Sequence, residues 1–377
     1  MEVKVFRKIS EIPEEDWRGF FPKGTENYSF LKMLDSLDFP QFRFYYAIVH
    51  AETTPIAAAP LFLMEDFQLD MGVKGALRRF TCSLKKVFPR LVSARIIFCG
   101  LISGPGQIGI RENPAGVIDA LVGAMEELAE KEKAAALVFK DFDVSYEPLL
   151  QRLSRQGFVR TKSLPMAVLK INFGSFDEYL KTLSSSSREG FRRKLKKIRE
   201  NPDFDFEITD TISDEVSGQM HGLYMETVGG SEVEFEELPK NYFSVLSRSM
   251  PADEVKYFLW RLNGKLVTFA QCFVRDSHFI DYYLGFDYSV SREYNLFLVR
   301  FKRLLEWCLE NKMKSYEIGQ SSYEIKRRLG FEFLPLYVYS RTRSKTGALF
   351  SKIYHKYLAF EHFEPVLKES SKCIISP

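Results

Sequence analysis

The residues best suited to proton transfer lie in two short segments of the second half of the chain. In the first, HFIDYYLGF (278–286), Asp281 is the only carboxylate, Tyr283 is a possible proton donor or substrate wall, and Asp287 follows directly after the end. A carboxylate can take a proton from an attacking nucleophile, and a phenol can donate one. The alternatives are structural: an ion-paired strand residue for the acids and a core aromatic for the tyrosine.

The second segment, SYEIG (315–319), carries Glu317 in the middle of an expected strand. Gln320 and Ser321 follow it, where the strand meets the next helix. Glu317 is a candidate general base, with a solvated or salt-bridged strand residue as the alternative. His221, on an expected helix in QMHGLYMETVGG, is a further candidate base. The five histidines show no metal-ligand or triad spacing, so a metal is not indicated.

A strongly basic stretch, SSSSREGFRRKLKKIREN (184–201), holds seven Lys or Arg against two Glu. Ser186 as N-cap with Glu189 three residues later predicts a helix that begins with a capping box. Apolar residues at helical spacing then predict that one side docks on the protein and the other presents charge. The cations expected to meet a phosphate-bearing ligand are Arg188, Arg192, Arg193 and Lys196. The alternative is a solvated surface helix.

Composition excludes several classes of protein. The net charge is +3, and the basic stretch alone contributes +5 (seven minus two), so the rest sums to −2 and the chain is not a general nucleic-acid binder. Five scattered cysteines suit reduced thiols in a cytosol. There is no signal-peptide core, and no apolar run approaches the roughly 18 residues needed to span a bilayer. We expect a cytoplasmic protein, at most peripheral on the inner face of the membrane.

Two distant parts of the chain share one order of predicted elements. In the second half, Asn263-Gly264 joins two β-rich runs and predicts a hairpin. The elements predicted there are strands 255–262, 265–274 and 278–286, a helix over 292–311, strand 315–319, a short helix over 322–331 and a last strand over 333–340. The first half repeats this order with strands 55–63, 94–103 and 136–142, a helix over 115–133 and a short helix ending in LSRQGF. The alternative is two unrelated α/β domains.

The repeat predicts two β–β–β–α–β–α–β modules. The expected domains are 1–163, 164–345 and a C-terminal helical tail over 346–377. LSRQGF and KRRLGF occupy equivalent places in the two modules.

This order of elements resembles the GNAT acyltransferase fold, and two modules in tandem resemble the Fem-type aminoacyl transferases and FemAB-like acetyltransferases. The segments that carry the resemblance are 184–197, 264–320 and 323–331. It implies an α/β (α+β) protein of two tandem GNAT-like modules, each a mixed, mostly antiparallel sheet flanked by helices. It also implies that the second module is catalytic and the first degenerate.

The resemblance further implies where the chemistry occurs. In the GNAT fold the parallel strands, here 278–286 and 315–319, splay apart, and acyl group and amine meet in the gap. Fem-type enzymes carry a lysine in the place of Lys326, near the donor or the oxyanion. The alternative for Lys326 is a lone surface lysine on a short helix.

The identity of the donor follows less directly from the resemblance. Most GNAT enzymes hold coenzyme A on a Q/R-x-x-G-x-G/A loop, whereas this chain has GFDYSVSREYNLF (285–297) at that place. Fem-type enzymes lack that loop and use aminoacyl-tRNA, but their long helical arm has no counterpart here. We therefore expect no permanently bound cofactor and, as donor substrate, acyl-CoA or an acyl carrier, with aminoacyl-tRNA as the alternative.

Two further motifs lie in the first half. VKGALRRFTCSLKKVFPR (73–90) combines an apolar face with a uniformly basic one, as in a helix at the surface of an anionic membrane. The alternative is a helix docked on the module. GPGQIG (104–109) formally matches a dinucleotide fingerprint, but no helix begins within it, so a turn is expected.

These observations predict an N-acyltransferase that acts on an amine, with a lipid or cell-envelope precursor at the membrane face as possible acceptor. The alternatives are a Fem-type aminoacyl transferase that acts on a peptidoglycan precursor, and a non-catalytic GNAT-fold binding protein.

Overall fold

The computed structural model describes residues 1–68, 93–112, 114–199, 204–229, 236–343 and 367. Its contacts divide the chain into two compact units. Unit 1 comprises Met1–Pro165 with the chain from Pro335 onward, and unit 2 comprises Met166–Leu334.

The sheet of unit 1 is mostly antiparallel. Its strands are, in spatial order, β1 (Glu2–Phe6), β2 (Phe42–Ala51), β3 (Thr54–Gln68), β4 (Ser93–Cys99), β6 (Ala136–Asp143) and β13 (Glu332–Thr342), and β5 (Gly109–Ile110) pairs with β3. Among the pairs of this order, β4 and β6 are parallel and the others antiparallel.

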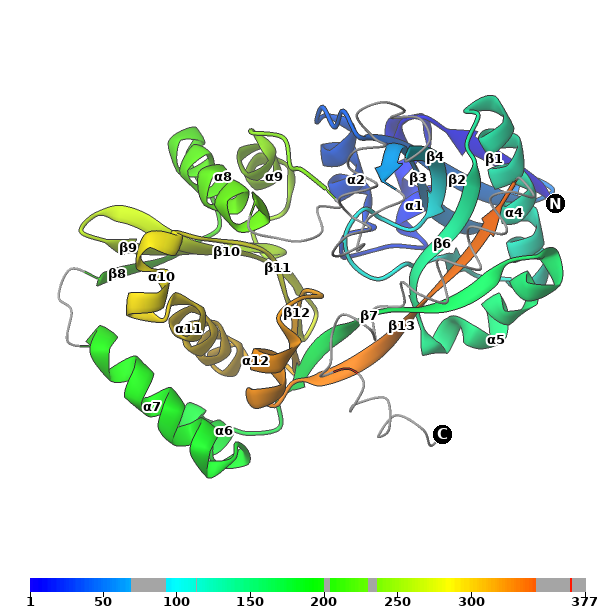
Figure 1. The fold of residues 1–377 in the computed structure, drawn as a ribbon. Helices are drawn as coiled ribbons and strands as arrows, with labels where there is room; N and C mark the ends of the chain where they lie inside the picture. The colour runs from blue at the N-terminus through cyan, green and yellow to red at the C-terminus, as the bar shows by residue number, and fades with distance from the viewer. Residues whose placement is uncertain (69–92, 113, 200–203, 230–235, 344–366, 368–377) are drawn as a thin grey trace. The chain divides into compact units, whose positions relative to one another are not determined.

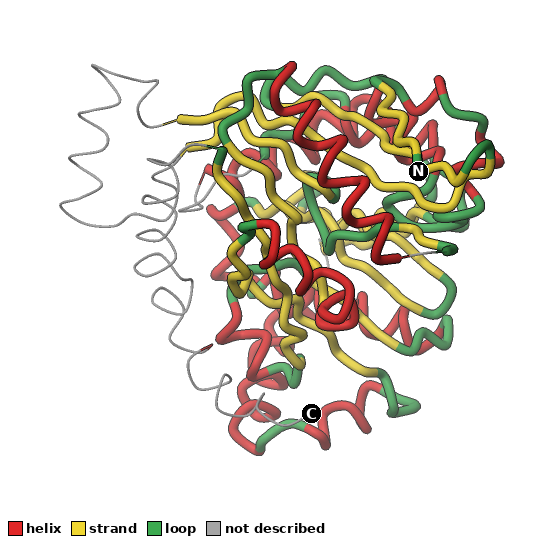
Figure 2. The backbone as a smooth tube through the Cα atoms, turned by 90° about the vertical axis from the view of Figure 1, so that its right-hand side faces the viewer, coloured by secondary structure: helices red, strands yellow, loops and turns green. Residues whose placement is uncertain are grey.

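Helices cover both faces of this sheet. The long helix α4 (Pro114–Lys131) crosses one face, where it packs on an aliphatic core with α5 (Glu147–Leu150) and the 3-10 segments η3 (Val144–Tyr146) and η4 (Gln151–Gln156) (Figure 2). On the other face lie η1 (Ile9–Glu11), α1 (Glu14–Arg18) and α2 (Tyr28–Asp35). There Trp17 packs edge-on against Tyr46, with ring centroids 5.7 Å apart.

The sheet of unit 2 repeats the pattern of unit 1. Its strands are, in spatial order, β8 (Phe204–Thr209), β9 (Val255–Leu262), β10 (Lys265–Arg275), β11 (His278–Phe286), β12 (Ser315–Ile318) and β7 (Val159–Lys170). Again one pair of this order, β11 with β12, is parallel and the others are antiparallel. The predicted repeat of a GNAT-like module is therefore confirmed.

Strand β7 ends the first half of the sequence and β13 ends the second, but each of them pairs in the sheet of the other half. Residues 167–170 of β7 pair with β12 in unit 2, and residues 336–342 of β13 pair with β6 in unit 1. The contacts therefore separate the chain at 165/166 and 334/335, whereas the sequence suggested boundaries after 163 and 345. Of the predicted helical tail, 346–377, only Leu367 is among the described residues.

Helices also cover both faces of the sheet of unit 2 (Figure 1). On one face α11 (Leu296–Glu310) packs on the strands, with α6 (Phe176–Thr182) and α7 (Ser185–Arg199) against α11. On the other face lie α8 (Asp214–Gly229) and α9 (Tyr242–Ser249). The short helix α12 (Tyr323–Arg328) follows β12.

The helix predicted over 292–311 is interrupted. It consists of α10 (Tyr288–Tyr294) and α11, because Asn295 between them has a φ of +50°. Asparagine tolerates this left-handed conformation better than most residues. None of the helices among the described residues has the length and apolar character needed to cross a bilayer.

Candidate active site

The parallel strands β11 and β12 pair over a short length at the centre of unit 2. Their register runs from His278 opposite Ser315 to Asp281 opposite Ile318, where β12 ends. Beyond this point the two strands are not paired. The predicted gap between these strands therefore begins at Asp281.

A β-bulge in β11 decides which way its side chains point. Gln271 of β10 pairs with Tyr283 and Cys272 pairs with Asp281, so Tyr282 is an extra residue in β11. Simple alternation would place Asp281 and Tyr283 on one face. Because the bulge adds a residue between them, they lie on opposite faces: Asp281 toward α11 and Tyr283 toward α8 and α9.

Asp281 is the centre of a buried ion pair on the α11 face. Arg300 Nη2 donates to Asp281 Oδ2, and neither side chain is exposed. The Tyr316 hydroxyl donates to the same oxygen at 3.0 Å. Burial raises the pKa of the Asp281 carboxyl, against the opposing attraction of Arg300. Arg300 Nε and Nη1 have no hydrogen-bond partner in the described structure.

Lys326 adds a second buried cation near this pair. Its side chain is 2% exposed, so Lys326 is not the surface lysine of the alternative interpretation. Lys326 Nζ donates to the carbonyl of Gly319, the residue that follows β12. Its charge also lowers the pKa of Asp281. Two cations and one carboxylate thus lie where β11 and β12 separate, an arrangement that can stabilise a developing oxyanion.

Glu317 lies on the opposite face of the sheet. Tyr316 and Ile318 on either side of it belong to the α11 core, so alternation directs Glu317 toward the α8 and α9 face. Its neighbours in the adjacent strands are Ile280 and Val168. Burial raises the pKa of this half-buried carboxyl, and Arg275 partly offsets the increase. A carboxylate with a raised pKa is suited to accept a proton near neutral pH.

Tyr283 and His221 also belong to the α8 and α9 face. The Tyr283 hydroxyl donates to Glu236 Oε1 at 2.7 Å, and its side chain is almost fully buried. His221 has a ring nitrogen 3.0 Å from the carbonyl of Leu238. The structure therefore places Glu317, Tyr283 and His221 on one face, and Asp281 with Lys326 on the other.

The three predicted binding residues near the strand ends differ in their surroundings. Asp287 caps helix α10, because it accepts a hydrogen bond from the backbone N–H of Ser289 at 2.9 Å. It also pairs with Lys265 at 2.7 Å. Burial raises the pKa of Asp287, but Lys265 and Ser289 outweigh it and hold the pKa below its ordinary value. Gln320 is half-buried, and Ser321 is exposed.

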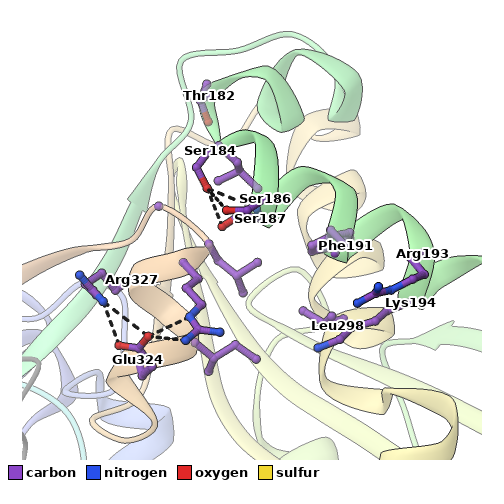
Figure 3. Close-up of a pocket in the computed structure, with 16 residues that line it drawn as sticks. Thr182, Ser184, Ser186, Ser187, Phe191, Arg193, Lys194, Leu298, Glu324 and Arg327 are labelled. Carbon is purple, nitrogen blue, oxygen red and sulfur yellow. Dashed lines mark hydrogen bonds and ion pairs between the residues drawn. The ribbon is translucent and has the colours of Figure 1, made fainter.

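A cavity of about 840 Å³ lies between the N-terminal half of α7 and α12 (Figure 3). Four of its lining residues are cations and one is an acid: Arg193, Lys194, Arg327, Arg328 and Glu324. Glu324 pairs with both arginines of α12, whereas the two cations of α7 make no ion pair with a described residue. The cavity therefore carries an excess of positive charge.

The start of α7 opens on this cavity. The helix begins at Ser185, and Ser184 is its cap: Ser184 Oγ accepts a hydrogen bond from the N–H of Ser187 at 3.2 Å. The predicted capping box of Ser186 and Glu189 is therefore wrong, because the helix begins earlier. The serine hydroxyls and the positive end of a long helix both favour anions at this place.

Of the predicted cations whose side chains lie in the described structure, one lines the cavity. Arg193 does, whereas Arg188 is half-buried and Arg192 exposed, and neither is among the lining residues. The side chain of Lys196 lies outside the described structure. Lys194 was missed, although a helical wheel centred on Gly190 places Ser186, Ser187, Arg193 and Lys194 on one face.

Two motifs of the first half have different outcomes. The basic segment 73–90 lies outside the described residues. GPGQIG is a loop that bends at Gly104, with a φ of +87°, and leads into β5, and a Cβ on Gly106 would lie 2.3 Å from the carbonyl oxygen of Lys140. These glycines therefore allow the loop to pack on β6, and no helix begins within the motif.

The fold is shared with several solved structures. Over 92% of this chain and 97% of the other, it is similar to L-PGS from Bacillus licheniformis, with a TM-score of 0.55 and 11% identity. It is similar to FemX over 95% of this chain and 100% of that one, with a TM-score of 0.55 and 13% identity. A tandem GNAT protein from the clavulanic acid biosynthesis pathway has a TM-score of 0.55 and 10% identity, over 91% and 99% of the two chains.

No curated protein matches the sequence. A family model does match residues 8–368, nearly the whole chain: the FemAB-like family of peptidoglycan biosynthesis or recognition. The chain belongs to the FemAB-like family.

Proposed function

We propose that this protein is a transferase of cell-envelope synthesis that moves an acyl or aminoacyl group from a phosphate-bearing donor to an amine. The observation that carries the proposal is the cavity between α7 and α12. It combines four cations, a row of serines and the N-terminus of α7. Phosphates are the anions that such a combination of helix end and arginine or lysine binds best.

The two faces of the sheet supply the groups that acyl transfer needs. The amine attacks the carbonyl carbon of the donor, the new C–N bond forms, and the C–S or C–O bond of the donor breaks. Glu317 takes the proton of the amine, and the leaving thiolate or alkoxide takes up a proton. Lys326, buried near the end of β12, stabilises the oxyanion that develops on the carbonyl.

Direct attack on the donor, without a covalent enzyme intermediate, is supported by the cysteines of unit 2. Cys272 and Cys308 are fully buried, and burial raises the pKa of each thiol well above its ordinary value. A thiol in such surroundings is inert, since the thiolate is the nucleophile.

Two donors remain candidates. The first is an acyl thioester, either acyl-CoA or an acyl carrier. It binds as a substrate, so the protein would hold no permanently bound cofactor. Aminoacyl-tRNA is the second, and membership of a family linked to peptidoglycan favours it. With either donor the acceptor is an amine of an envelope precursor, and the protein acts in the cytoplasm or at the inner membrane face. The family also covers recognition, so a binding protein without catalysis is the remaining alternative.

Binding of coenzyme A and of tRNA to charge-reversal variants tests this proposal. Arg193→Glu with Lys194→Glu should weaken binding of the correct donor at least about tenfold at low salt, with a smaller effect at high salt because exposed charges are screened. Lys181→Glu is the matched control, since Lys181 is exposed on α6 and does not line the cavity. Equal losses in both variants, or no binding of either ligand to the wild type, would refute the donor site.

A further inference from the structure

A layer of tyrosines lies between the sheet of unit 2 and helices α8 and α9. Around Tyr283 the ring centroids of Tyr282, Tyr242 and Tyr224 lie 4.8, 5.4 and 5.8 Å away. Tyr257 of β9 completes the layer and donates to the carbonyl of Phe243 in α9. Tyr282 is only half-buried, and the layer reaches solvent there.

Gln271 lies at the centre of this layer, and its amide atoms make no hydrogen bond to a described residue. It is opposite Tyr257 in β9 and Tyr283 in β11, so its side chain shares their face of the sheet. Gln271 is 0% exposed, and among the described residues neither its Nε2 nor its Oε1 has a hydrogen-bond partner. The hydroxyl of Tyr242, 1% exposed, has none either. Buried polar groups without partners are costly, so these atoms are suited to meet a ligand.

One carboxylate, Glu236, contacts this layer. Burial raises the pKa of both Tyr283 and Tyr242 well above the ordinary value, and Glu236 and the neighbouring tyrosines raise it further. The Glu236 carboxylate is held close by the hydroxyl of Tyr283. Tyrosine rings with an adjacent carboxylate attract cations, and organic ammonium groups above all.

We propose that the tyrosine layer is the subsite for a primary ammonium group, and that this group is the amine that accepts the transferred acyl or aminoacyl unit. Gln271 Oε1 and the Tyr242 oxygen accept hydrogen bonds from the ammonium, and the tyrosine rings surround its charge. Glu317 projects from the same face of the sheet and takes the proton that the amine must lose before it attacks. The assignment of the amine as acceptor rests on the proposed transferase function, whereas the binding of an ammonium group does not.

The first experiment measures binding of n-butylammonium by NMR of ¹³C-tyrosine-labelled full-length protein, with n-butanol as the uncharged analogue. Wild type should bind butylammonium saturably and at least about tenfold more tightly than butanol. Gln271→Met and Tyr242→Phe should each weaken butylammonium binding about tenfold, which corresponds to about 1.4 kcal/mol.

Tyr45→Phe is the matched control. The Tyr45 side chain in unit 1 is also buried, but Arg7 lies 4.5 Å above its ring. A phenol beside a guanidinium has no affinity for a further cation, so this variant should bind butylammonium as wild type does. Equal weakening in all three variants would contradict the proposal.

Thermal unfolding separates a ligand site from a structural role of Gln271. Because neither amide atom bonds to a described residue, Gln271→Met removes no hydrogen bond that the structure shows, and its unfolding midpoint should equal or exceed that of wild type. A clearly lower midpoint would show that Gln271 supports the fold, and it would overturn the proposal.

Measuring the binding of coenzyme A and tRNA beside that of butylammonium tests the ammonium subsite and the proposed donor site separately. If coenzyme A or tRNA binds the cavity while butylammonium fails to bind, the ammonium subsite is refuted and the donor site is supported. If butylammonium binds while neither donor does, the subsite is supported and the proposed donor site is refuted.

Discussion

The buried pair of Asp281 and Arg300 should make unit 2 highly sensitive to the loss of one charge. Neither side chain is exposed, and two nitrogens of the guanidinium already lack partners. Asp281→Asn keeps the size of the side chain but leaves Arg300 without a counter-charge. Removing one member of a buried ion pair costs about 3–5 kcal/mol. With a urea m-value of about 2 kcal/mol/M, the unfolding midpoint should fall by about 1.5–2.5 M.

Tryptophan fluorescence can report this unfolding. Two of the three tryptophans, Trp260 and Trp307, are buried in unit 2, and the third is Trp17 in unit 1. A Trp17→Phe background therefore restricts the signal to unit 2. Asp214→Asn is the matched control, since Asp214 pairs with Arg248 in the same unit but both are exposed. That variant should leave the midpoint nearly unchanged, because exposed pairs contribute little.

The stability of the Arg300→Met variant should depend on pH, in a direction that follows from the pKa of Asp281. Without Arg300, the pKa of Asp281, which burial already raises, should rise further above its value in the unfolded chain. A group whose pKa is raised on folding stabilises the fold at low pH and loses that contribution as the pH rises through the folded-state pKa. The variant should therefore be less destabilised at pH 5 than at pH 8.

Three results would refute this reasoning. One is an unchanged midpoint for Asp281→Asn, and another is equal destabilisation of Arg300→Met at both pH values. The third concerns the double variant Asp281→Leu/Arg300→Met, which removes both charges and should recover most of the lost stability. If the double variant is as unstable as the worse single variant, lost packing and not the unpaired charge causes the effect.

Three further predictions concern the site and its scaffold. Glu317→Gln should lower kcat about 10²–10⁴-fold. It should also abolish the rise of activity with pH that a general base of raised pKa produces, and a retained pH profile would exclude Glu317 as the base. Ser184→Ala should destabilise the start of α7 by about 1 kcal/mol, measured as faster amide exchange at 185–188, and unchanged exchange would show that the cap contributes nothing. Gly285→Ala should lower the unfolding midpoint strongly, because its Cβ would lie 2.6 Å from the backbone of Leu223 in α8, and a stable variant would show that α8 can move away from β11.

Much of the fold could be predicted because the turn and periodicity signals of single elements agreed with the order of elements repeated in the two halves. Asn263-Gly264 predicted the hairpin of β9 and β10, and both residues adopt the positive φ that the turn requires. The short strands β1 (EVKVF) and β8 (FDFEIT) were not predicted, although apolar residues alternate with charged ones in both, which is the pattern of a half-buried strand. The exchange of β7 and β13 was also missed, because pairing partners nearly 200 residues apart leave no local pattern in the sequence.

The candidate site was harder to predict from the sequence than the fold. The site residues were chosen by position along strands, and one bulged residue, Tyr282, was enough to move Tyr283 to the face opposite Asp281. Gln271 was not considered, because nothing in LVTFAQCFV distinguishes a glutamine with unmade hydrogen bonds from one in an ordinary strand. Such properties depend on what packs around a residue, which the spacing of residue types does not contain.

The exchanged strand β13 has a consequence for synthesis of the chain on the ribosome. Thr342 pairs with Ala136 of β6, so unit 1 lacks one edge of its sheet until nearly all of the chain has been translated. At about 5–20 residues per second, the intervening stretch takes on the order of 10–40 s to translate. During that time β6 exposes an unpaired edge to solvent, a state that chaperones recognise and that invites aggregation. Nascent chains truncated before residue 336 should therefore bind chaperones, whereas chains that include β13 should be released.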